Sequence, residues 1–123
     1  YRKLPNIIAF LEDVHAIFGS SAKNTFSFGW HKGVLEGQLS SLNIPTYMVQ
    51  PKEWQAYSWK GITPIKAKKK GNKVKTTDTK ATSLMAATTL FPHAQFVPKG
   101  CKNPDMGMVD ATLIGWYGVK QRP

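Results

Sequence analysis

The sequence contains few of the residues that build disulfides, zinc sites or membrane spans. It has one cysteine, Cys101, and three histidines in 123 residues. An internal disulfide is therefore excluded, and a Cys/His zinc site is not expected. No apolar run approaches the roughly 20 residues of a membrane helix, and the first residues lack the pattern of a signal peptide. We therefore expect a soluble protein with no membrane partner.

Acidic residues are also scarce. Seven acids stand against 17 lysines and arginines, which gives a formal net charge of +10. Such an excess of positive charge in a soluble domain indicates a polyanionic partner, usually nucleic acid, but charge alone does not distinguish DNA from RNA or from an anionic membrane. Apolar residues make up 41% of the chain, enough for a folded core, and the length leaves no room for a second one. We expect one domain over residues 1–123.

The apolar pattern alternates between strand-like and helical segments. Residues 7–11 form a continuous apolar run, which predicts a strand buried on both faces in a partly parallel sheet. From about residue 26 to 42 the apolar residues recur at helical spacing, with Thr25 as the expected N-cap and Asn43 near the end. The other expected elements are a strand at 44–49, a helical turn at 51–55, a mobile loop at 56–77, a helix at 80–90 capped by Asp78 or Thr79, an extended piece at 95–97 and a helix from about 108. This alternation is typical of an α/β architecture.

Two segments have unusual compositions. Gly29, Gly33 and Gly37 lie four residues apart in the expected helix, so they share one face and leave a bare stripe where another backbone can come close. The expected loop at 56–77 contains no acid. Its lysines are Lys60, Lys66, Lys68, Lys69, Lys70, Lys73 and Lys75. Such a run of like charge indicates a surface that contacts a phosphate backbone.

Three acids stand where a strand or an apolar helix begins or ends. Glu12 follows the first apolar run, and ligands of open α/β sheets collect at the carboxyl ends of strands. The alternative is a solvated residue at a strand terminus. Asp110 lies among apolar neighbours on the last expected helix, either as a functional acid or as an acid stabilised by the helix dipole. Asp105 lies five residues before Asp110, which is about 140° round a regular helix, so the two acids cannot share one helix face. Asp105 therefore either caps the helix or reaches a site from the preceding loop.

Carboxylates that converge beside a basic surface are suited to phosphodiester hydrolysis with two Mg²⁺ ions. Hard oxygen ligands hold such ions, one of which activates water while the other stabilises the leaving oxygen. The lysines would hold the phosphate backbone. The sequence therefore predicts a metal-dependent nuclease site that draws on Glu12, Asp105 and Asp110.

Four stretches, taken in order, resemble the RuvC-like Holliday junction resolvases, especially their phage-encoded and organellar branch. They read FLEDVHAIFGSSAKNTFSFGWHKGVLEG, VQPKEWQ, TKATSLMAATTLFP and DMGMVDATLIGWYG. The resemblance implies an RNase H-like mixed sheet flanked by helices, a homodimer, and Mg²⁺-dependent symmetric nicking of four-way DNA junctions in recombination and repair, with Mn²⁺ as a substitute. It also implies a location in the cytoplasm of a bacterial or phage-infected cell, or in an organelle stroma or matrix.

The resemblance also assigns roles to individual residues. Glu12 takes the place of the family's strand-end catalytic glutamate, Asp110 that of its last helical acid, and Lys80 that of a lysine near the scissile phosphate. Phe26 and Phe28 correspond to the region that meets the junction centre, where an aromatic ring stacks on unpaired bases. Core packing is the alternative for Phe28. The expected DNA-binding residues are Lys23, Phe26, Phe28, Lys32, Lys68, Lys69 and Lys70.

The chain departs from the family pattern in two places. Gly107 and Met106 stand where the family usually has an acid, and Asp105 matches only a variant with an acid five residues before the last one. Nothing matches the family's first-strand catalytic aspartate, so we expect the first strands to be absent and metal binding to be poor. Two alternatives to a resolvase follow. One is a module that binds branched nucleic acid without cutting it, and the other is a generic basic RNA-binding protein.

Overall fold

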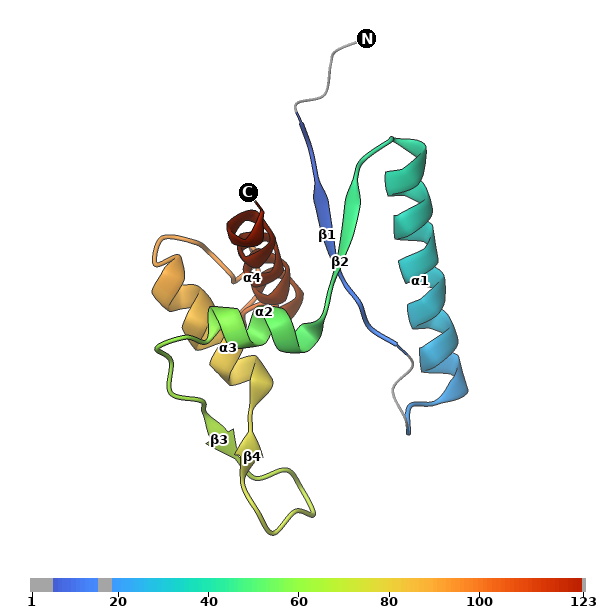
Figure 1. Cartoon of the computed structure of the whole chain (residues 1–123). Coiled ribbons are helices and arrows are strands. Elements are labelled where there is room, and N and C mark those ends of the chain that lie inside the picture. The colour runs from blue at the N-terminus through green and yellow to red at the C-terminus, as the bar shows by residue number, and fades with distance from the viewer. Residues whose placement is uncertain (1–5, 16–18, 123) are drawn as a thin grey trace. The chain divides into compact units, whose positions relative to one another are not determined.

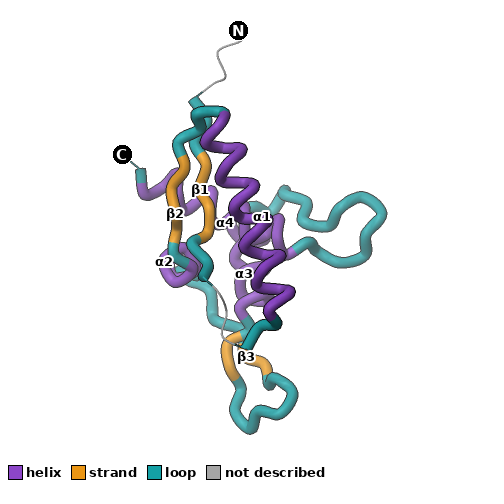
Figure 2. The backbone as a smooth tube through the Cα atoms, turned by 90° about the vertical axis from the view of Figure 1, so that its right-hand side faces the viewer, coloured by secondary structure: helices purple, strands orange, loops and turns teal. Residues whose placement is uncertain are grey.

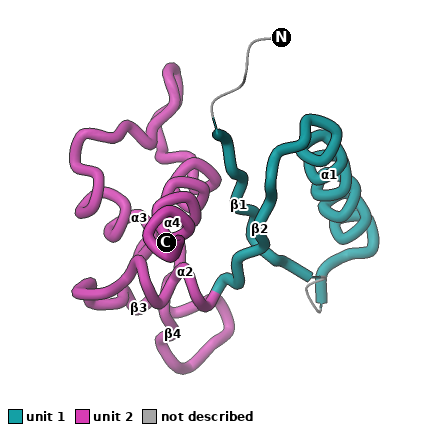
Figure 3. The backbone as a smooth tube through the Cα atoms, turned by 45° about the horizontal axis from the view of Figure 1, so that its top comes forward, with its two compact units in different colours: residues 1–51 teal, residues 52–123 magenta. Residues whose placement is uncertain are grey.

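The computed structural model describes residues 6–15 and 19–122 and has the mixed α/β composition that the sequence predicted (Figure 1). The chain divides into two compact units (Figure 3). Unit 1 ends at Pro51, and unit 2 begins at Lys52. In the described ranges, no helix is both long enough and apolar enough to cross a membrane.

Unit 1 consists of two parallel strands and the helix that connects them. Strand β1 (Ala9–Glu12) pairs with β2 (Thr46–Val49) in a register that sets Ala9 opposite Thr46 and Glu12 opposite Val49. Parallel strands cannot be joined by a tight turn, so the chain must cross back between them. Helix α1 (Ala22–Ser41) makes this crossover and lies alongside the strand pair (Figure 2). The predicted parallel pairing is therefore confirmed.

The prediction that the first strand is buried on both faces was wrong. Ile7 and Ile8 are exposed and precede β1, and all four residues of β1 are only half-buried. In the described part of the chain, β1 belongs to a sheet of two strands. An apolar run indicates that a segment favours burial, but it does not show whether neighbouring elements cover both of its faces.

The ends of α1 are set by local hydrogen bonds rather than by the apolar pattern. Ser21, not Thr25, is the N-cap, and its Oγ accepts the N–H of Asn24 at 3.2 Å. Serine is the stronger cap, and the residues after it tolerate a helix although they are polar, so α1 begins before the apolar periodicity does. After the C-cap Leu42, Asn43 adopts a left-handed φ of 53°, a conformation that asparagine tolerates better than most residues.

Unit 2 is built on three helices. Helix α2 (Pro51–Ser58) is longer than the single turn expected and begins with proline, whose fixed φ suits a first helical position. Helix α3 (Thr79–Leu90), with Asp78 as its N-cap, packs against α4 (Met106–Gln121). The buried apolar side chains of this unit are Trp54, Ala86, Ala87, Phe96, Val109, Leu113 and Ile114.

Two very short strands lie within the expected loop. Strands β3 (Lys66–Ala67) and β4 (Thr76–Thr77) pair antiparallel, and we call residues 66–77 the lysine ribbon (Figure 1). The extended piece expected at 95–97 forms no strand. Its central residue Phe96 instead packs in the core, while its carbonyl accepts the N–H of Asp105 at 2.7 Å.

The core of unit 2 predicts that truncation of two apolar side chains of α4 will change the free energy of unfolding by very different amounts. Leu113 is fully buried, whereas Val119 is 68% exposed. We expect Leu113→Ala to lower the free energy of unfolding by about 2–5 kcal/mol, because it leaves a cavity. The matched change Val119→Ala should alter it by no more than about 0.5 kcal/mol. Urea unfolding followed by circular dichroism measures both, and equal losses would show that α4 does not pack as described.

Candidate functional site

Glu12 lies at the carboxyl end of β1, where the sequence placed it. It is the last residue of the strand, opposite Val49, and its side chain is half-buried. It borders a hollow of about 300 Å³ between β1 and α1. The other residues around this hollow are Leu11, Val14, Phe28, His31, Lys32 and Leu35. Glu12 is therefore held beside an aromatic ring and a lysine on a neighbouring element.

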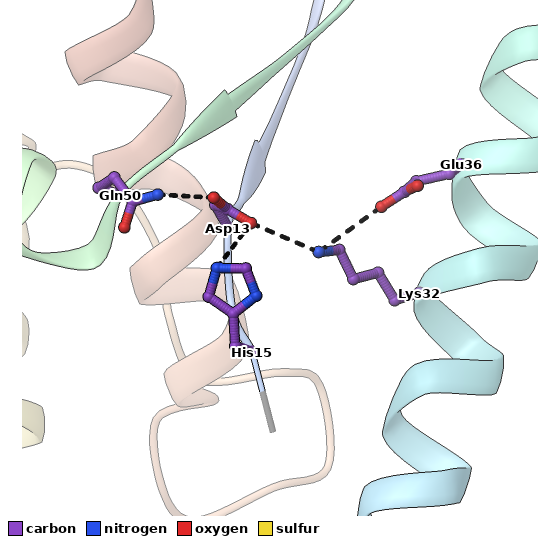
Figure 4. A network of polar contacts seen from close by, with 5 residues as sticks. All are labelled: Asp13, His15, Lys32, Glu36 and Gln50. Atoms are coloured by element: carbon purple, nitrogen blue, oxygen red, sulfur yellow. Dashed lines mark hydrogen bonds and ion pairs between the residues drawn. The ribbon is translucent and has the colours of Figure 1, made fainter. Parts of the chain in front are cut away.

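Asp13, the next residue, is the centre of a polar network that the sequence did not reveal (Figure 4). Its backbone N–H donates to the carbonyl of Val49 at 2.8 Å, so the parallel ladder continues one residue beyond β1. Its carboxylate accepts a hydrogen bond of 2.6 Å from Gln50 Nε2 and lies 3.7 Å from both His15 and Lys32. The network thus joins the ends of both strands to α1.

Lys32 is engaged by two carboxylates. Its ammonium group lies 3.7 Å from Asp13 Oδ1 and 3.7 Å from Glu36 Oε1, one helical turn along α1 (Figure 4). Only 26% of its side chain is exposed. A phosphate would have to compete with both acids for this lysine. The spacing of Lys32 and Glu36 was visible in the sequence as an i,i+4 pair, but the third partner comes from a distant strand end.

The two phenylalanines expected at the junction centre lie on different faces of α1. Two residues correspond to about 200° of helical rotation, so Phe26 and Phe28 cannot stack on the same base. Phe28 is 51% exposed and borders the hollow beside Glu12. It also borders a second hollow of about 380 Å³, with Val14, His15, Ser20, Asn24, Thr25, Gly29 and Lys32. Phe26 is 77% exposed.

In unit 2, Asp105 is the N-cap of α4. Its Oδ1 accepts the N–H of Met108 at 3.0 Å, which selects capping from the two alternatives for this residue. The cap also accounts for Gly107, since a Cβ at this position would stand 3.1 Å from the same carboxylate oxygen. An acid at 107, where the family resemblance leads one to look for it, would crowd the cap. Asp110 follows five residues later in α4 and is half-buried.

The three proposed metal ligands are divided between the units. Glu12 belongs to unit 1, while Asp105 and Asp110 belong to unit 2. Among residues 6–15 and 19–122, no three His, Cys, Asp or Glu side chains form a group that could hold a metal ion. Glu12 is thus the only one of the three in unit 1, and Asp105 and Asp110 lie in unit 2.

Positive charge is concentrated in unit 2. This unit has 13 of the 17 basic residues and four of the seven acids, a formal charge of +9, and unit 1 has the other four and three, a formal charge of +1. Lys68, Lys69 and Lys70 lie exposed on the lysine ribbon, and Lys80 lies exposed in the first turn of α3. Lys23 is exposed near the start of α1. The largest cationic surface is therefore the ribbon.

The capping geometry predicts different effects for two substitutions of Asp105. Asp105→Ala should lower the free energy of unfolding by about 1 kcal/mol because the N–H of Met108 loses its acceptor. Asp105→Asn should preserve stability, since asparagine caps helices about as well as aspartate. Urea unfolding tests both variants. A loss of Mg²⁺-dependent DNA nicking in Asp105→Asn at unchanged stability would contradict a role limited to capping.

No protein-family model and no curated protein matches the sequence, and no solved structure matches the fold.

Proposed function

We propose that this chain acts in a Mg²⁺-dependent endonuclease with an RNase H-like fold, which resolves four-way DNA junctions by symmetric nicking. The observation that carries the proposal is the place of Glu12. A carboxylate at the carboxyl end of a parallel strand, beside a hollow lined by an aromatic ring and a lysine, stands where α/β proteins bind their ligands. The ordered family resemblance along the chain supports the same activity.

The distribution of charge supports DNA as the substrate. A formal charge of +9 on a unit of 72 residues would be costly without a polyanion to neutralise it. Within the proposal, Glu12 and Asp110 are Mg²⁺ ligands, and Lys80 contacts the phosphate that is cut. The exposed lysines contact the phosphates of the duplex arms.

Phe28 is the residue proposed to meet the junction centre. Its ring is accessible and borders two hollows whose other walls include hydrogen-bonding side chains such as Asn24 and Thr25. Such a surface suits an unpaired base, which stacks on an aromatic ring and offers polar edges. Because Lys32 is paired with acids, we assign it to the support of this surface rather than to direct phosphate binding.

The outer face of α1 supports a homodimer. At 100° per residue, Phe26, Trp30, Gly33 and Gly37 fall within a sector of about 60°. Both aromatic rings are exposed, Trp30 to 59%. A Cβ built on Gly33 or Gly37 meets no atom within 4 Å, so packing within the described part of unit 1 does not explain these glycines. Each costs about 1 kcal/mol of helix stability relative to alanine, which a close helix contact would offset.

This face is complementary to itself. The aromatic rings lie toward the N-terminal half of α1, and the glycines lie toward its C-terminal half. Two antiparallel copies related by a two-fold axis near Gly33 place Trp30 of each helix over Gly37 of the other. A two-fold dimer also matches the symmetry of a four-way junction, because two nicks at symmetric positions require two equivalent sites.

One observation favours a second candidate function, which is binding of branched nucleic acid without cleavage. Asp105 is used as a helix cap, and Gly107 stands at a position where the family resemblance leads one to expect an acid. A domain with fewer metal ligands would retain the cationic and aromatic surfaces and lose the chemistry. A chain that binds four-way junctions in preference to duplex, and cuts neither with Mg²⁺ nor with Mn²⁺, has this second function.

The proposed role of Glu12 predicts a separation of cutting from binding. Glu12→Gln should abolish Mg²⁺-dependent nicking of a synthetic four-way junction, because the amide is a poor Mg²⁺ ligand, and leave junction affinity nearly unchanged. Glu53 is an exposed acid in the first turn of α2. The control variant is Glu53→Gln, which should cut normally. Denaturing gels of labelled junctions give the cutting, and fluorescence anisotropy in EDTA gives the affinity. Normal cutting by Glu12→Gln would refute the nuclease site.

The dimer proposal predicts opposite effects of one substitution on folding and on association. Gly37→Leu should raise or maintain the stability of the monomer, because leucine favours helices and meets open space. It should weaken the dimer by at least about tenfold in Kd, which corresponds to 1.4 kcal/mol. Sedimentation equilibrium measures the association. Gln38→Leu, on the adjacent face, is the control, and equal dimerisation of both variants would exclude this interface.

A further inference from the structure

The lysine ribbon presents a cationic surface with no acid of its own. Lysines at 66, 68, 69, 70, 73 and 75 are all exposed, and residues 59–77 include no aspartate or glutamate. The charges of the ribbon are thus held close together without a carboxylate in the same segment, an arrangement that a polyanion would stabilise.

The base of the ribbon is fixed to α3 by one buried hydroxyl group. Thr82 is fully buried, and its Oγ1 donates to the carbonyl of Asp78 at 2.7 Å while it accepts the N–H of Ile65 at 3.0 Å. The N–H of Asp78 in turn donates to the carbonyl of Ile65 at 2.7 Å. Both ends of the ribbon are therefore held at the N-terminal end of α3, from which it projects (Figure 1).

The helix end beside the ribbon is not itself an anion site. The carboxylate of Asp78 already accepts the N–H of Ala81 at 3.1 Å. A hollow of about 300 Å³ between the ribbon and the start of α3 is bordered by Lys68, Lys69 and Lys80 and by Asp78 itself. Lysine side chains, rather than backbone N–H groups, must therefore supply the contacts to an anion here.

The base of the ribbon is narrow enough for the major groove of B-form DNA. Its two residue pairs, Lys66 with Thr77 and Ala67 with Thr76, are paired as strands, which lie about 4.8 Å apart, and the major groove, about 12 Å wide, admits a two-stranded ribbon. Residues 68–75 continue from this base as a loop. Gly71, with a φ of 89°, and the bond from Asn72 N–H to the Lys69 carbonyl close a narrow turn at the tip. Exposed lysines precede the turn at 66–70 and follow it at 73 and 75, so both arms of the ribbon carry charge for the phosphates of a groove wall.

The composition of the ribbon argues against other nucleic acids. Proteins that bind single strands stack the bases on aromatic side chains, and residues 60–80 include no aromatic residue. A-form RNA has a deep and narrow major groove that side chains cannot enter. The ribbon also lacks arginine and glutamine, and asparagine occurs once, at Asn72. Contacts to base edges are therefore few, and binding should depend little on sequence.

We propose that the lysine ribbon inserts into the major groove of a B-form DNA arm and positions it, without reading its sequence, relative to α3 and Lys80. This inference rests on the proposed function in one respect, that the polyanion is DNA, and it names the part of the substrate that unit 2 holds. Phe28 of unit 1 would meet unpaired bases, and the ribbon would meet paired ones.

The test compares two triple variants of the full chain. Lys68, Lys69 and Lys70 are changed to glutamine in the ribbon variant, and Lys99, Lys102 and Lys120, which are exposed outside the ribbon, are changed to glutamine in the control. Fluorescence anisotropy in EDTA gives duplex affinity over a range of salt concentrations. The plot of log K against log salt has a negative slope. In the ribbon variant this slope should become less steep by about 0.9 for each lost phosphate contact. An equal effect of the control would overturn the inference.

A second arm of the experiment identifies the groove. In one set of duplexes, glucosylated 5-hydroxymethylcytosine fills the major groove. The affinity of the wild-type chain for these duplexes should fall to that of the ribbon variant for plain duplex, or below it. Netropsin, which fills the minor groove of A·T-rich DNA, should have no effect on plain duplex. Unchanged binding to glucosylated duplex, or competition by netropsin, would overturn insertion into the major groove.

Failure of this inference is distinguishable from failure of the proposed function. A chain whose ribbon binds plain duplex as described, but which neither prefers nor cuts four-way junctions, supports the ribbon and refutes the resolvase. A ribbon variant that binds and cuts junctions as the wild type does, with plain and with glucosylated arms, supports the resolvase and refutes the ribbon.

Discussion

The parallel pairing of β1 with β2 is the constraint on which the candidate site depends. A parallel partner requires a long crossover, so α1 has to lie along the strands, and the carboxyl ends of both strands have to emerge at the same end of the pair. Asp13 and Gln50 meet for this reason, although 37 positions separate them in the chain. The same constraint sets Glu12 beside Phe28. An antiparallel pair joined by a short turn would bring neither Asp13 to Gln50 nor Glu12 to Phe28.

Strand pairing joins the elements of unit 1, whereas buried hydroxyl groups join elements of unit 2. Its core includes buried Ser58, Thr82 and Ser83 among the apolar residues of α2 and α3. Two of these hydroxyls connect elements across the unit: Thr82 accepts from Ile65, and Ser83 accepts from the indole N–H of Trp59 at 3.3 Å. A buried hydroxyl that bonds to a distant backbone or indole group orients the segments it joins. The base of the strongly charged ribbon is thus held by the hydrogen bonds of Thr82.

The sequence predicted the features that depend on local chemistry. The parallel strands and the crossover helix follow from apolar spacing, and the structure bears them out. Of the two residues that could cap α3, Asp78 and Thr79, the structure selects Asp78. The start of α1 was placed too late because polar residues can be helical without adding to the apolar pattern. The two-residue strands of the ribbon are too short for any periodicity to reveal.

The contacts of the candidate site depend on residues that are distant in sequence. Asp13 was visible only as a neighbour of Glu12, and its link to Gln50 and Lys32 exists because three elements come together. Asp105 shows the opposite case. Its capping role was one of two readings of a local motif, and a single hydrogen bond to Met108 separates them. Local rules list such alternatives, and tertiary structure selects among them.

The closure of the ribbon at its base has a consequence for how this part of the chain can vary. Because the bonds among Ile65, Asp78 and Thr82 hold both ends of the segment, the residues between them form a closed loop whose length is not fixed by the rest of unit 2. The entropic cost of such a loop rises only with the logarithm of its length, by about 0.6 kcal/mol for each doubling. The tip around Gly71 can therefore lengthen or shorten over evolution, which would change how far the ribbon projects from α3 while leaving α3 itself unchanged.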